Sequence, residues 1–456
     1  MQYYTILDFV FLPVYLIIIL MMANIYANKK KVAEPCYAYF TFGLTVKIIG
    51  GLGLAFVYTI YYPGGDTTEY FRNVTSLEGL ALFDFDSFWY VMTQPASNSN
   101  ILFFNSETGY AVYCRDPKAW SVVKIALPIV ILSMQSFLAT TVMCATISFA
   151  GIWRLYKVFV QEFPELKREM AISFLFIPSV FFWGSGLLKD TFTLSALGFF
   201  FAGLYTLLVR KEKIWGSIFT IAVSAYVITS IKPYIMVGLV PALIIWIVQL
   251  TVGKINAKTV RALAIPLFFL VGVGCAYFFM VFMGESLAEY QVESILEKAK
   301  ITQRDLKSDY YQGNSFDIGD FESNVPSIIK KFPIATFSAI FRPLIVESNN
   351  LVMFFSGFEN LILLIFAIRV LILVRVFGIF KYLFTHHLLT FSLFFSLFFA
   401  FSVGLSTSNF GSLVRYKIPS IPYFVASMYI IQYLKLRELK MKAAAKGDYI
   451  DASKIV

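Results

Sequence analysis

The chain has 456 residues, of which 58% are hydrophobic and only 14% are charged, and its formal net charge is +10. A soluble domain carries roughly a quarter charged residues, so this composition excludes an ordinary soluble protein and predicts an all-α polytopic membrane protein. The positive charge does not indicate nucleic acid as a partner, because Lys and Arg gather between apolar runs and no nucleic-acid-binding motif is present.

Apolar runs long enough to cross a lipid bilayer follow one another along the chain. Spanning the hydrocarbon takes roughly 20 apolar residues. We expect about eleven membrane spans, in the range of about 10–12, within one polytopic domain over residues 1–456. They are 6–27, 37–61, 132–156, 171–185, 190–209, 215–231, 235–252, 262–284, 351–375, 388–408 and 418–434. The segments 171–185 and 215–231 are short, so they could be tilted or half-buried helices.

Basic residues orient these spans. The first run is too long for a signal peptide and lacks a small-residue cleavage site, so we interpret it as a retained helix. Lys29, Lys30 and Lys31 follow it, and the positive-inside rule places them in the cytoplasm. Alternation then makes every basic connection cytoplasmic: 154–168, 210–213, 254–261, 375–381 and the tail 435–456. The sequence therefore predicts an outer N-terminus and a cytoplasmic C-terminus.

Two long loops face outward in this topology. The first, 62–131, opens with YYPGGDTTEYFR, in which two glycines that permit a sharp turn precede Asp66 and Glu69. The second, 285–350, begins with a charged stretch whose apolar residues fall near helical spacing, which predicts an amphipathic surface helix.

Polar residues gather at five predicted outer helix ends. The charged members are Asp66, Glu69, Lys189, Asp190, Lys232, Arg342, Glu347, Arg415 and Lys417. Ionisable groups at membrane depth are costly and usually face a polar cavity or a partner. Cations near the outer leaflet would suit an anionic headgroup, since Arg binds phosphate bidentately and Lys binds it as a point charge. An acid beside them could act as a base.

These residues also have structural interpretations. Asp66 and Glu69 could be solvated residues after a glycine turn. Lys189 and Asp190 could pair with each other at a helix start, where a carboxylate in the first turn meets free N–H groups.

The other junctions leave similar alternatives open. Lys232 precedes Pro233, which forces a break between helices, and its side chain could snorkel to the membrane interface. Arg342 and Glu347 could pair with one another. Tyr70 could pack the first loop down or join an interfacial aromatic belt.

The chain offers little for metal or disulfide chemistry. Its four cysteines form no CxxC pair, and its two histidines, His386 and His387, are adjacent in sequence. Metal sites need larger ligand clusters, so we expect no metal site and no cofactor. A divalent metal could assist the acids of the first loop, but the sequence shows no cage of ligands for it.

Several stretches resemble envelope-polysaccharide membrane proteins of bacteria. They are D-x-x-E-Y in the first outer loop, PSVFFWGSGLLKD, KPY, RP followed by E, and NFGSLVRYKIP, spread over residues 37–434. This group includes GT-C-type glycosyltransferases, which use lipid-phosphate-linked sugars, and O-antigen-polymerase-like proteins. The resemblance implies a GT-C-like helix bundle in the bacterial cytoplasmic membrane. It also implies a polyprenyl-(pyro)phosphate-linked sugar donor and a saccharide or glycolipid acceptor at the outer face.

The resemblance implies roles for nine polar residues. Asp66 would act as the base on the acceptor hydroxyl, with Glu69 second. The remaining residues would bind the lipid phosphate and substrate: Lys189, Lys232, Arg342, Arg415, Tyr70, Glu347 and Asn409. In that family the acidic loop usually follows the first helix and the N-terminus is cytoplasmic. Here it follows the second helix, so the assignment requires 6–27 to be a helix.

Two other functions stay open. The first is a transporter or flippase for a lipid-linked sugar, whose cations would line a translocation path. Transporters usually show repeats and helices broken at mid-membrane, and no repeat is visible here; charges reaching the bilayer centre would favour this function. The second is a non-catalytic subunit of an envelope assembly. The sequence leaves the sugar, the acceptor and the oligomeric state undetermined.

Overall fold

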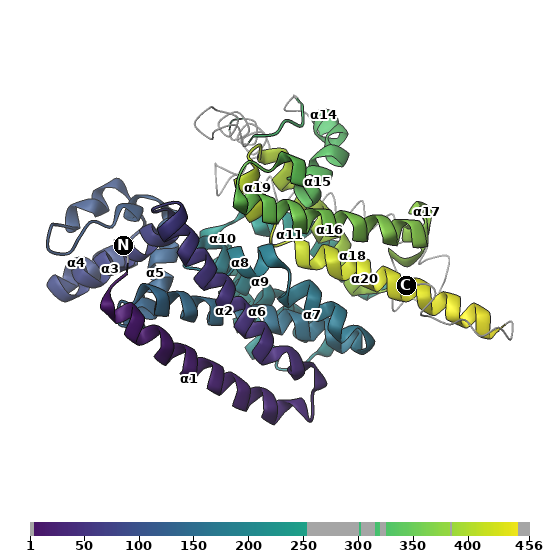
Figure 1. Cartoon of the computed structure of the whole chain (residues 1–456), viewed down its shortest axis with the longest axis horizontal. Helices are drawn as coiled ribbons and strands as arrows, with labels where there is room; N and C mark the ends of the chain where they lie inside the picture. The colour runs from purple at the N-terminus through teal and green to yellow at the C-terminus, as the bar shows by residue number, and fades with distance from the viewer. Residues whose placement is uncertain (1–3, 253–300, 302–314, 320–324, 384, 446–456) are drawn as a thin grey trace. The chain divides into compact units, whose positions relative to one another are not determined.

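The computed structural model describes residues 4–252, 301, 315–319, 325–383 and 385–445 (Figure 1). In these ranges the regular structure is helical, and the only β-type pairing is an isolated bridge between Ser315 and Asn409. Eight of the helices described there are long and apolar enough to cross a membrane. The prediction of an all-α polytopic membrane protein is therefore confirmed, whereas the count of eleven spans is not.

The eight candidate spans match eight of the predicted segments. They are α1 (Ile6–Lys31), α2 (Phe40–Phe56, within the span Pro35–Tyr61), α6 (Phe137–Glu162), α9 (Lys189–Tyr205, continuing to Arg210), α10 (Ile214–Ile231), α11 (Tyr234–Val252), α16 (Leu351–Val374) and α18 (His387–Ser406).

The remaining three predicted spans have different outcomes. Residues 171–185 contain parts of two short helices, α7 (Lys167–Leu175) and α8 (Pro178–Trp183), because Pro178 interrupts the helical run. The predicted segment 418–434 lies in α20 (Ile421–Ala444) from its fourth residue on; this helix is long but gathers charges in its second half. Residues 262–284 lie outside the described part of the chain.

The predicted loops are largely helical where they are described. The first contains α3 (Asp66–Phe83), α4 (Phe85–Thr93) and α5 (Pro117–Leu132). The second ends with α14 (Val325–Lys330) and α15 (Phe332–Phe341), and its predicted amphipathic helix lies outside the described residues. The chain then divides into two compact units, Met1–Met236 and Val237–Val456.

In the first unit, α1 is a helix with defined neighbours. It begins after Thr5, whose backbone N–H and hydroxyl both donate to Asp8. The other carboxylate oxygen of Asp8 accepts hydrogen bonds from the Ser136 hydroxyl (2.8 Å) and the Leu138 N–H (2.9 Å) at the start of α6. These bonds place the beginnings of α1 and α6 side by side. The first helix that the acidic-loop assignment requires is therefore present.

Small residues allow close helix packing in this unit. A Cβ atom on Gly151 of α6 would lie 2.1 Å from the Ser195 carbonyl oxygen of α9, and one on Gly198 of α9 would lie 2.3 Å from the Gly151 carbonyl oxygen. Only glycine fits such a crossing, a device common between membrane helices.

The first two helices of this unit run in opposite directions. Tyr4, just before α1, hydrogen-bonds Thr59 near the end of the second span, so α1 and α2 are antiparallel. At the opposite end, Lys157 of α6 pairs with Glu34 (2.5 Å), three residues after the lysines that end α1. We call the other end the Asp66 end, because α3 begins there.

The second unit is built around α18. A Cβ on Gly404 of α18 would lie 2.0 Å from the Ala335 carbonyl oxygen, so α15 and α18 are in backbone contact. In the same unit, α20 packs against α16, where the rings of Phe366 and Tyr429 lie 4.6 Å apart. A short helix, α19 (Phe410–Tyr416), precedes α20.

Candidate functional site

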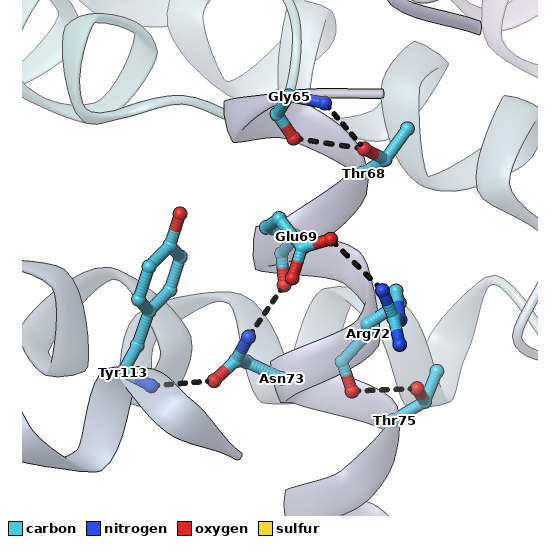
Figure 2. A network of polar contacts seen from close by, with 7 residues as sticks. All are labelled: Gly65, Thr68, Glu69, Arg72, Asn73, Thr75 and Tyr113. Carbon is cyan, nitrogen blue, oxygen red and sulfur yellow. Dashed lines mark hydrogen bonds and ion pairs between the residues drawn. The ribbon is translucent and has the colours of Figure 1, made fainter. Parts of the chain in front are cut away.

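A glycine turn delivers Asp66 to the start of a helix. Gly64 (φ 138°) and Gly65 (φ 137°) adopt a backbone conformation that L-side chains rarely take, and a Cβ on Gly65 would lie 2.5 Å from the Tyr58 ring. The Gly65 N–H donates to the Thr68 hydroxyl (3.1 Å), which donates in turn to the Gly65 carbonyl oxygen (2.8 Å; Figure 2). Asp66 is therefore held in the first turn of α3, where a carboxylate favours the helix dipole.

Lys189 brings three helix starts together. It is the first residue of α9, and its ammonium lies 3.3 Å from the carboxylate of Asp116, the N-cap residue of α5. Asp66, at the start of α3, lies within electrostatic range of the same ammonium. Lys189 and Asp190 do not form the ion pair that the sequence allowed, because adjacent residues on a helix do not face each other.

Asp190 pairs instead with Lys232. The Lys232 ammonium donates to the Asp190 carboxylate, and the two side chains are only 6% and 1% exposed. Lys232 directly follows α10, and the break before α11 occurs at Pro233, as the sequence predicted. The side chain does not snorkel to the interface, because it is held in the interior by Asp190.

These five residues form what we call the α9 cluster: Asp66, Asp116, Lys189, Asp190 and Lys232. It contains two ammonium groups and three carboxylates, so its formal charge is one negative, not the cationic surplus expected from the sequence. Beside it, Thr67 is 1% exposed, and its hydroxyl has no hydrogen-bond partner within the described residues. This hydroxyl faces Gly186, in the turn before α9.

Glu69 and Tyr70 point to other surroundings. Glu69 pairs with Arg72 one turn along α3 (2.9 Å), and the two side chains are 35% and 63% exposed (Figure 2). Asn73 connects this helix to the loop before α5, donating to the Glu69 carbonyl oxygen and accepting from the Tyr113 N–H, both at 2.7 Å. Tyr70 is buried, with its ring 4.8 Å from that of Tyr113. This contact supports the packing interpretation of Tyr70.

In the second unit, Arg342 and Glu347 pair as the alternative interpretation predicted. The guanidinium Nε lies 3.0 and 3.2 Å from the two carboxylate oxygens, and Nη2 also donates to Glu347. The guanidinium carbon lies 4.9 Å from the ring of Phe316 and 5.2 Å from that of Phe410. Burial alone would raise the pKa of Glu347, but the hydrogen bonds from Arg342 and the Leu344 N–H outweigh it and lower the pKa.

The other predicted residues of this unit lie on or next to α19. Asn409 is its N-cap, accepting from the Ser412 N–H (3.2 Å), and Arg415 lies half-buried in its last turn. Lys417 is 1% exposed and donates to three oxygens: the Ile340 carbonyl (3.0 Å), the Arg342 carbonyl (3.3 Å) and the Asn360 side chain (2.6 Å). Three acceptors satisfy an ammonium completely, which indicates a structural role.

Sequence reasoning missed several polar residues inside the apolar runs. Lys47 lies near the middle of the second span and is 3% exposed, and Glu359 lies in α16 and is 7% exposed. An ionisable residue inside a long apolar run is the signal that would have identified both. Asp116 was missed because its importance depends on the fold, which places it beside Lys189.

No protein-family model, no curated protein and no solved structure matches this chain. The resemblance to GT-C-type proteins therefore stays a prediction.

Proposed function

We propose that this chain is an integral membrane glycosyltransferase or polysaccharide polymerase. It would use a polyprenyl-(pyro)phosphate-linked sugar at the outer face of a bacterial cytoplasmic membrane and transfer it to a saccharide or glycolipid acceptor. The observation that carries the proposal is the α9 cluster, in which half-buried Asp66 lies within electrostatic range of the partly exposed ammonium of Lys189 where three helices begin.

The proposed chemistry needs a base and a cation in one place. Glycosyl transfer builds positive charge on the sugar and negative charge on the departing phosphate. Asp66 would take the proton of the acceptor hydroxyl. Lys189 would stabilise the leaving phosphate, aided by the partial positive charge of the helix starts around it.

The pairing of Lys189 is compatible with this role. Its contact with Asp116 is long, 3.3 Å, and the Asp116 side chain is 49% exposed. Ion pairs between partly solvated groups contribute little, about 0–1 kcal/mol, so a phosphate oxygen can compete for the ammonium. Lys232, fixed by Asp190, would position the start of α9 rather than bind phosphate. Arg342, in the second unit, is paired with Glu347, and the proposed chemistry does not depend on it.

A transfer assay tests the proposal. The full chain in lipid nanodiscs is given a panel of polyprenyl-phosphate-linked hexoses and oligosaccharide acceptors, and the released polyprenyl phosphate is measured. Asp66→Asn is expected to lower turnover by about 10²–10⁴-fold, the range for loss of a general base. Lys189→Gln is expected to lower it as well. Exposed Glu107, in the same segment of the chain, provides the control variant Glu107→Gln.

The outcome is interpretable only if the variants are folded, so their unfolding temperatures are compared with that of the wild type. Wild-type turnover in both folded variants would refute the proposed roles of Asp66 and Lys189. The same pair of variants should lose envelope polysaccharide when they replace the native protein in its host.

Two observations favour a second candidate, a transporter of a lipid-linked sugar. Lys47 places an ionisable group in the middle of a membrane span, and residues 184–188 form a buried, non-helical stretch between α8 and α9. Both features occur in transporters. Movement of a fluorescent polyprenyl-phosphate sugar across proteoliposomes, without release of polyprenyl phosphate, would favour this function over transfer.

A further inference from the structure

A buried lysine in α2 has no part in the proposed chemistry. The Lys47 ammonium donates to the Val180 carbonyl oxygen at 3.3 Å, and this is its only hydrogen bond within the described part of the chain. An ionisable side chain inside a membrane span is costly to bury, so its retention calls for a specific interaction.

The Val180 carbonyl is at the end of a helix. It belongs to the last turn of α8 and also accepts from the Gly184 N–H at 3.2 Å. Helix carbonyl ends carry partial negative charge, so an ammonium there is a favourable cap. The ammonium also contacts the following turn closely, because a Cβ on Gly184 would lie only 3.0 Å from it.

The turn after α8 is held from two sides. On α2, a Cβ on Gly50 would lie 2.3 Å from the Phe181 carbonyl oxygen, so the backbones touch one turn beyond Lys47. On α6, the Ser148 hydroxyl donates to the Gly184 carbonyl oxygen at 2.7 Å. Non-helical backbone inside a membrane requires such internal partners, because no lipid group can satisfy it.

This turn leads directly to the candidate site. Residues 184–188 are all buried, and the next two residues are Lys189 and Asp190. We propose that Lys47 is a positioning residue for the α9 cluster: by capping α8 it fixes the turn 184–188, and the turn fixes Lys189 and Asp190. The catalytic role of Lys189 rests on the proposed function, whereas its placement by Lys47 does not.

Thiol labelling tests the placement without any activity assay. Lys189→Cys is introduced into the full chain in nanodiscs, and its labelling by a membrane-impermeant maleimide is timed. Of the four native cysteines, Cys36, Cys114 and Cys144 are buried and Cys275 lies outside the described residues; the chain without Lys189→Cys measures their combined background. Adding Lys47→Met removes the cap with little change in volume, and we expect the labelling rate at position 189 to change at least ~3-fold.

Two comparisons separate positioning from general loss of stability. Asp8→Asn weakens the contact between α1 and α6 without removing a hydrogen bond to the turn, and should leave labelling within about twofold of that in Lys189→Cys alone. Ser148→Ala removes the hydrogen bond that α6 donates to the turn without altering charge, and should change labelling in the same direction as Lys47→Met. It serves as the second variant if Lys47→Met does not fold. If Lys47→Met folds and its labelling is unchanged, the inference is overturned. If only Ser148→Ala folds, unchanged labelling in that variant overturns it. An equal change in Asp8→Asn also overturns it.

The transfer assay adds a readout that a purely structural role would not give. With Lys189 intact, Lys47→Met should lower kcat more than it raises KM, because a misplaced Lys189 weakens stabilisation of the leaving group in the transition state. Equal effects on both constants would contradict this. If the wild type transfers no sugar, the proposed function fails while labelling still decides whether Lys47 positions the turn.

Discussion

Asp190 in the first turn of α9 and Lys232 at the end of α10 form a buried ion pair. The two residues are 42 positions apart in sequence, and both side chains are almost completely removed from solvent. A charge in such a place is tolerated because its partner compensates it. The pair therefore fixes the start of α9 to the break between α10 and α11, next to Lys189.

Removing one partner of this pair should be far more damaging than removing both. Lys232→Met or Asp190→Leu leaves an uncompensated buried charge, and we expect a loss of about 3–5 kcal/mol in unfolding free energy. The double variant should recover most of that loss. Unfolding in mixed detergent micelles measures the cycle, and a double variant as unstable as the sum of the singles would contradict the prediction.

The two acids of the first loop should differ in function. Glu69 is paired with Arg72, whereas Asp66 lies within electrostatic range of Lys189. In the transfer assay we expect Glu69→Gln to retain turnover within about threefold, since it removes only an exposed ion pair, while Asp66→Asn loses it. Loss of turnover in folded Glu69→Gln, with Asp66→Asn active, would assign the base to Glu69.

The glycine turn should not tolerate a side chain. Gly65→Ala forces an L-residue into a φ of 137° and sets its Cβ against the Tyr58 ring. A strained residue of this kind costs about 1–3 kcal/mol, so the unfolding temperature should fall. Gly216→Ala is the matched control, because a Cβ there meets nothing within 4 Å. Equal unfolding temperatures for the two variants would be evidence against the strain.

Acid should weaken the second unit through Glu347. Its pKa is lowered in the folded state, so its stabilising contribution is complete above the unfolded value of about 4.3 and is lost as pH falls through the lower folded pKa. Glu347→Gln should lower the unfolding temperature at pH 7 and flatten its decline below about pH 4. Thermal unfolding of wild type and variant across this range measures the effect. A variant with the same acid dependence as the wild type would assign that dependence to other groups.

Much of the architecture was determined by the sequence itself. The length of the apolar runs predicts membrane helices because a bilayer requires every backbone group to be paired within the segment. Eight predicted segments are such helices in the described part of the chain. The glycines before Asp66 predicted a sharp turn, and Pro233 predicted the break after α10, because both effects depend on local backbone sterics.

Partner choice was decided only by the tertiary structure. Lys189 and Asp190 are adjacent in sequence, yet they pair with Asp116 and Lys232, because neighbouring side chains on a helix point in different directions. Whether an ionisable residue contacts a carboxylate, a carbonyl or solvent depends on which distant helix end is brought beside it. Sequence patterns locate charges along each helix, but only packing brings Lys47 to the end of α8 and Asp66 to Lys189.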